Sequence, residues 1–197
     1  MPVILLVRHG RSSLSQKTPR LSAAEFRMWI ESYHQHGIAA DSRPSDSLLA
    51  EARAVALVVC SDLPRAVESA HRIAPGRDIA VNPHLREAGW PLPGNWGGLR
   101  LPLLMWDWSF HRLWRCGARS VGESANAARV RAREVCAWLE LRAQKQSPIL
   151  VVGHGTFNQF LATELRRHHW QGPRRPADHY WGATWYERDG QTDAVAS

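Results

Sequence analysis

The sequence predicts an α/β fold with a mostly parallel central sheet, and two apolar runs at residues 3–7 and 148–152 carry most of this prediction. Apart from Pro148, both runs contain only Val, Ile and Leu, with no alternation of apolar and polar side chains. Strands that are buried on both faces have this composition, and they are typical of parallel sheets covered by helices. Segments with helical patterns lie between the runs, as an α/β fold requires.

The first strand, at residues 3–7, ends on Arg8, His9 and Gly10. Ser22 and Glu25 then form a capping box, which predicts a helix from there to about residue 36 with a glycine stop at position 37. The elements expected next are a short helix at 46–53, a strand at 56–60, a helix at 63–73 capped by Ser61 and Asp62, and a short strand at 79–81.

The second half of the chain continues the alternation of helices and strands. After an irregular Trp-rich loop at 90–103, the expected elements are a helix covering a pocket at 103–115, a long helix from about 122 to 146, the strand at 148–152, a helix at 156–167, a last strand at 181–186 and a frayed tail at 189–197. Residues 1–197 are expected to form a single domain with cap-like insertions near 20–45 and 90–120.

Composition limits the partners and the compartment. The 25 basic residues, all but two of them Arg, exceed the 18 acidic ones, which favours anionic partners: small phosphorylated substrates, nucleic acid or acidic lipid. Because the arginines are dispersed, no nucleic-acid-binding arm is indicated. Three Cys without a C-x-x-C pair suggest neither a disulfide framework nor a zinc knuckle, so a cytoplasmic protein is expected. No apolar run is long enough for a membrane span, and the oligomeric state stays open.

Two strands each deliver a histidine, His9 and His154, at their carboxyl ends, where open α/β sheets place their ligands. If the strands are neighbours, these imidazoles meet Arg8 and Arg65 in one small pocket, with the N-terminus of the helix after His154 pointing into it. Arginine forks match phosphate oxygens bidentately, so the pocket is expected to select anions. Arg65, in the first turn of a helix, requires either a bound anion or pairing with Asp62.

These motifs resemble those of the histidine phosphatase superfamily, which includes the cofactor-dependent phosphoglycerate mutases. The similar segments are Leu6-Val7-Arg8-His9-Gly10, Cys60-Ser61-Asp62-Leu63-Pro64-Arg65-Ala66 with Ser69-Ala70 after it, Leu85-Arg86-Glu87, Gly122-Glu123-Ser124 and Val151-Val152-Gly153-His154-Gly155. Their order and spacing span nearly the whole chain. The resemblance implies a three-layer α/β/α sandwich of the phosphoglycerate mutase type.

The resemblance also implies roles for individual residues. His9 corresponds to a nucleophile that becomes phosphorylated, and Glu87 to a general acid that protonates the leaving alkoxide and then activates water. Phosphate and substrate would be held by Arg8, Ser15, Arg65, His154 and Gly155. Ser15 stands where many relatives carry a phosphate-contacting Asn, which leaves phosphate affinity and substrate choice open. No metal and no other cofactor is implied.

Metal-independent hydrolysis of phosphomonoesters is therefore the expected function. Phosphatase is favoured over mutase because a mutase's substrate-binding arginines do not map onto residues 99–117. Phosphoglycerate mutase-type transfer, protein phosphohistidine phosphatase activity and an inactive phosphate-binding regulator stay open as alternatives. The last is disfavoured, since binding alone needs neither a nucleophile nor an acid.

Two other patterns in the sequence are weaker. Cys136 and Arg142 have the C-x5-R spacing of cysteine-dependent phosphatases, but they fall inside a predicted helix, whose interior cannot cradle a phosphate with its amides. The adjacent His168 and His169 would diverge by about 100° on a helix and would not face one metal ion.

Overall fold

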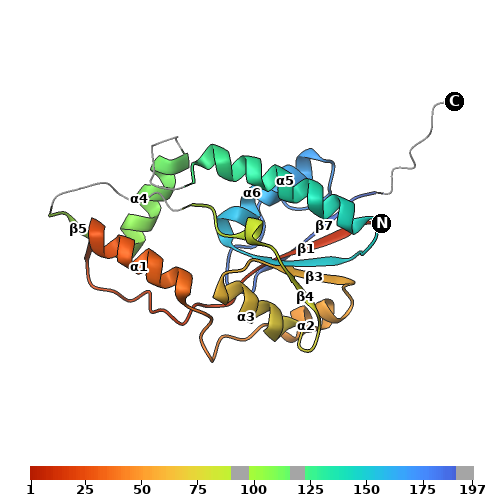
Figure 1. The fold of residues 1–197 in the computed structure, drawn as a ribbon, viewed down its shortest axis with the longest axis horizontal. Coiled ribbons are helices and arrows are strands. Elements are labelled where there is room, and N and C mark those ends of the chain that lie inside the picture. The colour runs from red at the N-terminus through yellow and green to blue at the C-terminus, as the bar shows by residue number, and fades with distance from the viewer. Residues whose placement is uncertain (90–97, 116–122, 190–197) are drawn as a thin grey trace.

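Five strands form one central sheet in the order β4-β3-β6-β1-β7 (Figure 1). The computed structural model describes residues 1–89, 98–115 and 123–189. The strands are β1 (Val3–Arg8), β3 (Leu57–Cys60), β4 (Ile79–Val81), β6 (Ile149–Gly153) and β7 (Ala183–Glu187). All neighbours pair in parallel except β1 and β7, which are antiparallel. This arrangement confirms the predicted α/β fold with its mostly parallel sheet.

The register of the central strands brings their carboxyl ends together at one edge of the sheet. Arg8 of β1 pairs with Gly153 of β6, and Cys60 of β3 lies opposite Val152. His9 and His154 each follow directly at this edge, because each is the next residue after its strand. Two apolar strands of similar length, aligned in parallel, therefore bring together side chains that are 145 positions apart in the sequence.

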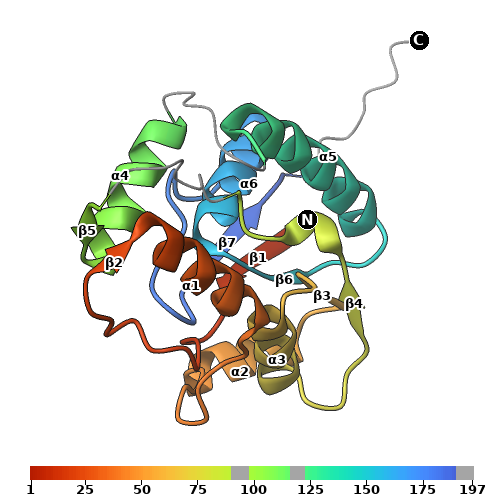
Figure 2. The same ribbon diagram turned by 60° about the vertical axis from the view of Figure 1, so that its left-hand side comes forward.

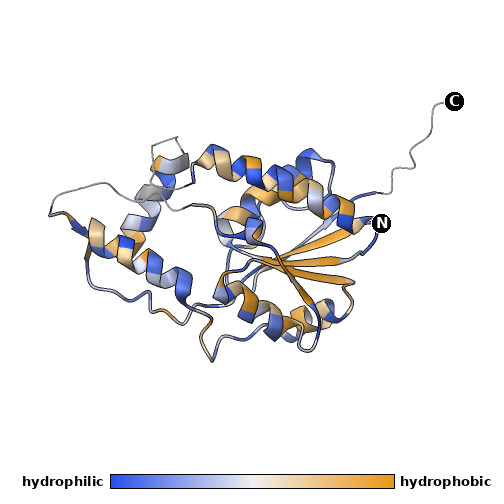
Figure 3. Cartoon of the chain, in the orientation of Figure 1, coloured by the Kyte–Doolittle hydropathy of each residue, from blue (hydrophilic) through white to orange (hydrophobic). Residues whose placement is uncertain are grey.

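Alternate residues of the strands pack into two separate apolar clusters, one on each face of the sheet. Helices α5 (Ala125–Ala143) and α6 (Gly155–Arg167) cover one face, and α2 (Asp46–Arg53) and α3 (Pro64–Ile73) cover the other. Figure 3 shows the central strands as uniformly apolar, whereas the helices carry polar residues on their outer sides. The three-layer α/β/α sandwich is thus confirmed.

A third apolar cluster joins the two segments expected as insertions. Helix α1 (Ala23–Gln35) packs against α4 (Leu103–Arg115), and a small ribbon of β2 (Leu21–Ser22) and β5 (Arg100–Leu101) links their starts (Figure 2). Trp106 stacks on Phe26, with ring centroids 5.8 Å apart, and its indole N–H donates to the carbonyl oxygen of Leu21 at 2.7 Å. The two segments therefore form one unit beside the main sheet.

The start of α3 differs from the prediction. Its N-cap is Leu63, followed by Pro64 in the first turn, and no side chain caps the helix. Proline fits the first helical position and keeps the residue before it extended, so the boundary moves one to two residues beyond Ser61 and Asp62. Ser61 instead accepts a hydrogen bond from the Leu63 amide at 3.3 Å, and Asp62 binds Arg86.

Other elements agree with the predicted ones to within a few residues. The capping box of Ser22 and Glu25 is present at the start of α1. The last strand begins at Ala183 rather than Trp181, because Trp181 has a left-handed backbone with φ of 64°. Most of the Trp-rich loop, the start of the long helix at 122 and the tail beyond 189 lie outside the described residues. Within the described segments, no helix combines the length and apolar character needed to cross a bilayer.

Candidate active site

His9 and His154 lie side by side at the carboxyl edge of the sheet. Their ring centroids are 5.0 Å apart, with the rings tilted by 58°. Both side chains are buried, His9 being 2% exposed and His154 fully enclosed. The sequence predicts that these two residues share one pocket if their strands are neighbours, and β1 and β6 are neighbours in the sheet.

The hydrogen bonds of His9 determine its tautomer. Nδ1 lies 2.7 Å from the carbonyl oxygen of Gly10, which can only accept, so Nδ1 carries the proton. Nε2 consequently holds a lone pair, and it accepts from Nε of Arg65 at 3.2 Å. Ser69 supports this geometry because its hydroxyl accepts from the Gly10 amide and donates to the carbonyl oxygen of Arg65. Gly10 has no space for a side chain, since the Trp181 ring lies directly against it.

Arg65 is fully buried and places its guanidinium beside His9. It lies over the ring of Tyr33, 4.2 Å from the centroid, and donates from Nη1 to the Tyr33 carbonyl oxygen at 3.0 Å. Asp62, the carboxylate considered as its partner, instead receives both forks of Arg86 at 2.7 Å. Of the two explanations for a cation in this first helical turn, the geometry favours a bound anion.

Several polar atoms in this region are buried without a hydrogen-bond partner within the described structure. They are Nε of Arg8, Nη2 of Arg65 and both ring nitrogens of His154. Arg8 donates from Nη1 to the carbonyl oxygen of Asp178 and lies over the Tyr180 ring at 4.7 Å, which fixes its orientation. Because leaving such groups unsatisfied is costly, these donors indicate a site for an anion with several oxygens.

Burial lowers the pKa of both His9 and His154 well below the usual histidine value, and the positive charge of Arg65 lowers each further. Both imidazoles are therefore neutral near pH 7. A neutral imidazole with its proton held at Nδ1 presents a nucleophilic lone pair at Nε2, which is the state that attack on phosphorus requires.

Glu87 binds the first amides of α6. Its Oε1 accepts from the amides of Ala88 and Phe157, both at 2.9 Å, and its Oε2 lies 3.4 Å from the amide of Thr156. Gly155 and Thr156, at the N-terminus of this helix, line the pocket, and Glu87 accepts from the amides of Thr156 and Phe157 there. The negative charge of Glu87 is favourable here because the N-terminus of a helix carries the positive end of the helix dipole.

A cleft of about 1100 Å³ opens over Arg8, His9 and Glu87. Gly155, the first residue of α6, lines it, and Arg8 approaches within 3.6 Å of the position where a side chain on Gly155 would begin. Ser15 is exposed and outside the lining; its hydroxyl accepts from the Lys17 amide at 3.1 Å. Of the predicted residues, Arg8, His9, Glu87 and Gly155 line the cleft, whereas Arg65 and His154 are buried beside His9 and Ser15 lies apart.

Comparison with known families gives a clear match. A model of the histidine phosphatase superfamily (branch 1) matches residues 4–197. The chain belongs to this superfamily. A search among curated proteins gives no match.

Several solved structures share the fold of this chain at low sequence identity. Phosphoserine phosphatase from Entamoeba histolytica, solved in complex with 3-phosphoglyceric acid, is 17% identical, with a TM-score of 0.56 over 94% of this chain and 90% of that one. Mycobacterial glucosyl-3-phosphoglycerate phosphatase is 22% identical, with a TM-score of 0.52 over 85% of this chain and 80% of that one. At these identities the likeness shows the phosphoglycerate mutase-like fold.

Four residues of this candidate site received no role from the sequence. Tyr33 and Tyr180 hold the two arginines, Ser69 supports the loop at Gly10, and Gln16 donates to the Tyr180 hydroxyl at 2.6 Å across the cleft. Ser69 lies within a segment that carries the family resemblance, but its role depends on a contact with a residue 59 positions away. Tyr33 and Tyr180 come from α1 and from the segment before β7, and only the folded chain brings them together.

The buried neutral histidines predict a loss of stability in acid. Their folded-state pKa values lie below the unfolded value near 6.5, so the unfolded chain binds more protons as the pH falls. Stability is therefore full above pH 6.5 and declines below it. At pH 5.5 each histidine is expected to cost about 1.4 kcal/mol of unfolding free energy. Urea titrations from pH 5 to 8 check this, and His154→Gln should flatten the decline whereas the exposed His169→Gln should not.

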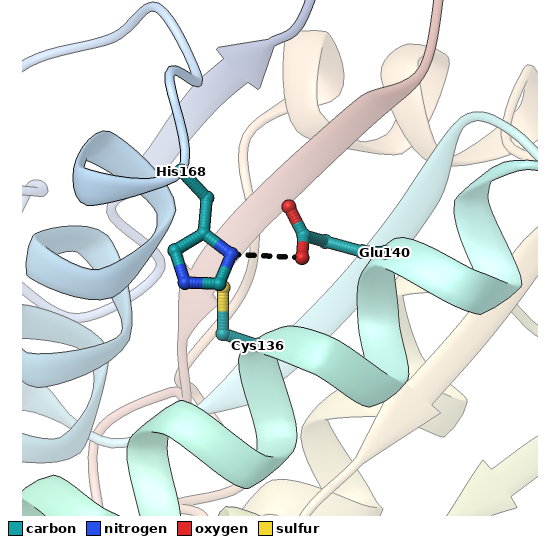
Figure 4. A group of neighbouring side chains, drawn as sticks. All are labelled: Cys136, Glu140 and His168. Carbon is teal, nitrogen blue, oxygen red and sulfur yellow. Dashed lines mark hydrogen bonds and ion pairs between the residues drawn. The ribbon is translucent and has the colours of Figure 1, made fainter.

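One cluster of metal-ligand types lies away from the cleft, at the far end of α6. Cys136, Glu140 and His168 bring a thiol, a carboxylate and an imidazole together (Figure 4). Glu140, however, accepts from His168 at 2.9 Å, from Trp170 at 2.9 Å and from Arg188 at 2.6 Å. Arg188 already neutralises this carboxylate, so the cluster ties α5 to the ends of α6 and β7. His169, with φ of 64°, leaves the helix, and the two adjacent histidines do not share a ligand.

Proposed function

We propose that this histidine phosphatase hydrolyses phosphomonoesters through a phosphohistidine formed on His9, without a metal ion. The observation that carries the proposal is the fixed tautomer of His9, whose Nε2 lone pair lies beside a buried arginine. Relatives of the same fold are named phosphoserine phosphatase and glucosyl-3-phosphoglycerate phosphatase, which supports hydrolysis as the reaction.

In the first step, the phosphoryl group binds between the two arginines and His154. Its oxygens accept from the unpartnered donors Nε of Arg8 and Nη2 of Arg65 and from a ring N–H of His154. Nε of Arg65 turns from His9 to a phosphoryl oxygen, which exposes the lone pair. Nε2 of His9 then forms the N–P bond while the bond from phosphorus to the leaving oxygen breaks.

Glu87 would supply the proton that the leaving oxygen needs. Oε1 is held by two amides at 2.9 Å, whereas Oε2 has one longer contact at 3.4 Å, so Oε2 is the oxygen best placed to carry and transfer a proton. In the second step, the ionised carboxylate accepts a proton from water as the water attacks phosphorus. Phosphate leaves, and His9 returns to its neutral state.

Two buried or half-buried guanidiniums would stabilise the transferring group. Phosphoryl transfer depends mainly on positioning and on charge stabilisation at the equatorial oxygens. Arg65 is preorganised by the Tyr33 ring and carbonyl, and Arg8 by Tyr180 and the Asp178 carbonyl. These fixed cations can take the part that divalent ions play in many phosphoryl-transfer enzymes, which is the basis for proposing a metal-independent reaction.

The test is phosphate release from p-nitrophenyl phosphate in the presence of EDTA. We expect turnover by the purified protein, at a rate that EDTA changes by less than about twofold. Loss of the activity on chelation, with recovery on adding back Mg²⁺ or Zn²⁺, contradicts metal independence. Absence of turnover with this substrate and with a panel of phosphorylated metabolites contradicts hydrolysis itself.

A further inference from the structure

The cleft is much larger than a phosphoryl group requires. It holds about 1100 Å³, and Arg8, His9 and Glu87 account for one end of it. The remaining walls come from α1, from α4, from the start of α6 and from residues 178–180. The space next to the transferring group is where the leaving group of a phosphomonoester must lie.

Aromatic and aliphatic side chains make up much of this second part. From α1, Trp29 and Tyr33 line the cleft as a stacked pair with centroids 5.1 Å apart. From α4, Leu104 and Trp108 line it from the facing side, one turn apart on the helix. These surfaces offer flat and apolar walls on both sides of the space.

Leu104 and Trp108 are unusually exposed for their size, at 73% and 67%. Large exposed apolar residues that are contiguous with a ligand cleft mark a surface that a ligand covers. Met105, which is 54% exposed on the same helix, is outside the cleft lining. Helix α4 therefore carries exposed apolar residues inside the cleft, such as Leu104, and one outside it, Met105, which can serve as a control.

The charges near this part of the cleft disfavour a second anion. Asp107 lines it from α4, where its carboxylate lies 3.2 Å from His111, and Asp178 lines it from the opposite segment. Apart from Arg8, the arginine among the described lining residues is Arg112. Its guanidinium lies over the Trp108 ring, 5.7 Å from the centroid. His111 and His179 also line this part, and His111 is already engaged by Asp107. A carboxylate on the leaving group would therefore meet two acidic residues, and the guanidinium is already placed over an aromatic ring.

We propose that the leaving group is bulky, presents an aromatic or extended apolar face to Trp108 and Leu104, and carries no second anionic group. This inference rests on the proposed phosphatase function and specifies its substrate class. It sets this chain apart from an enzyme for phosphoserine or phosphoglycerate, because the leaving groups of both carry a carboxylate.

Three aryl phosphates with phenols of similar acidity test the proposal without changing the chemistry at phosphorus. They are phenyl phosphate, 2-naphthyl phosphate and 3-carboxyphenyl phosphate. We expect kcat/KM to be about tenfold higher for the naphthyl ester than for phenyl phosphate, and several-fold lower for the carboxylated ester. The naphthyl ring tests the apolar walls, and the carboxylate tests the acidic ones.

Variants assign these preferences to residues. Trp108→Ala is expected to lower kcat/KM for naphthyl phosphate about tenfold, mainly through KM, and to lower it for phenyl phosphate by a clearly smaller factor. Trp108→Phe should retain most of the preference, and Met105→Ala should leave all three substrates unchanged. Asp107→Asn should raise kcat/KM for the carboxylated ester relative to phenyl phosphate.

The possible failures are distinguishable. Equal kcat/KM for the three substrates, or a Trp108→Ala effect that is the same on all of them, overturns the inference and leaves the phosphatase function in place. A preference for the carboxylated ester also overturns it. Absence of phosphate release from every substrate removes the proposed function, and the inference falls with it.

Discussion

His9→Ala is expected to lower kcat for phosphate release from p-nitrophenyl phosphate by at least about 10⁴-fold. Nε2 of His9 is the atom that would form the bond to phosphorus, and the ring of His154, the other imidazole at this sheet edge, is fully buried with its centroid 5.0 Å from that of His9. Without the first imidazole, the arginines still bind the phosphoryl group, but no nucleophile is placed against it.

Controls separate loss of the nucleophile from loss of the fold. The variant should still bind inorganic phosphate, because Arg8, Arg65 and His154 remain, and it should melt cooperatively. The exposed His169→Ala should keep wild-type turnover, which controls for the removal of a histidine as such. Retention of more than about one per cent of the wild-type rate by His9→Ala contradicts a phosphohistidine on this residue.

The sheet edge that carries the site follows from the sequence for a simple physical reason. The runs at 3–7 and 148–152 have no polar side chain, which favours strands in the centre of a sheet that is covered on both faces. The order of pairing and the register of Arg8 against Gly153 then place His9 and His154 together. Arg65 reaches the same edge because β3 pairs with β6, and α3, which carries Arg65, begins just beyond the end of β3.

The parts of the site that escaped sequence reasoning depend on packing between distant loops. Glu87 carried a predicted role, but its contact with the amides of Phe157 and Thr156 depends on where the loop after β4 meets α6. Tyr33 and Tyr180 support arginines that they do not neighbour in the chain. Ser15 was expected at the phosphate, but a local hydrogen bond holds its hydroxyl against the Lys17 amide. The next residue, Gln16, lines the cleft in its place.

Glu87→Gln is expected to lower steady-state turnover by about 10²–10⁴-fold and to leave phosphate on His9. The amide is nearly isosteric, and its oxygen can still accept from the Ala88 and Phe157 amides, so the loop should keep its position. The amide cannot, however, act as the base that accepts a proton from water. With p-nitrophenyl phosphate, whose leaving group needs little protonation, the first step should remain fast and the second should become slow.

This difference between the two steps gives a specific signature. A rapid-quench experiment should show a burst of p-nitrophenol close to one equivalent of enzyme, together with acid-labile, base-stable phosphate on the protein. With a simple alkyl phosphate the burst should disappear, because the leaving alkoxide requires the missing proton in the first step. Slow turnover without a burst on the aryl substrate would mean that Glu87 acts before the phosphohistidine forms, and a raised KM with unchanged kcat on both substrates would assign it to binding rather than to proton transfer.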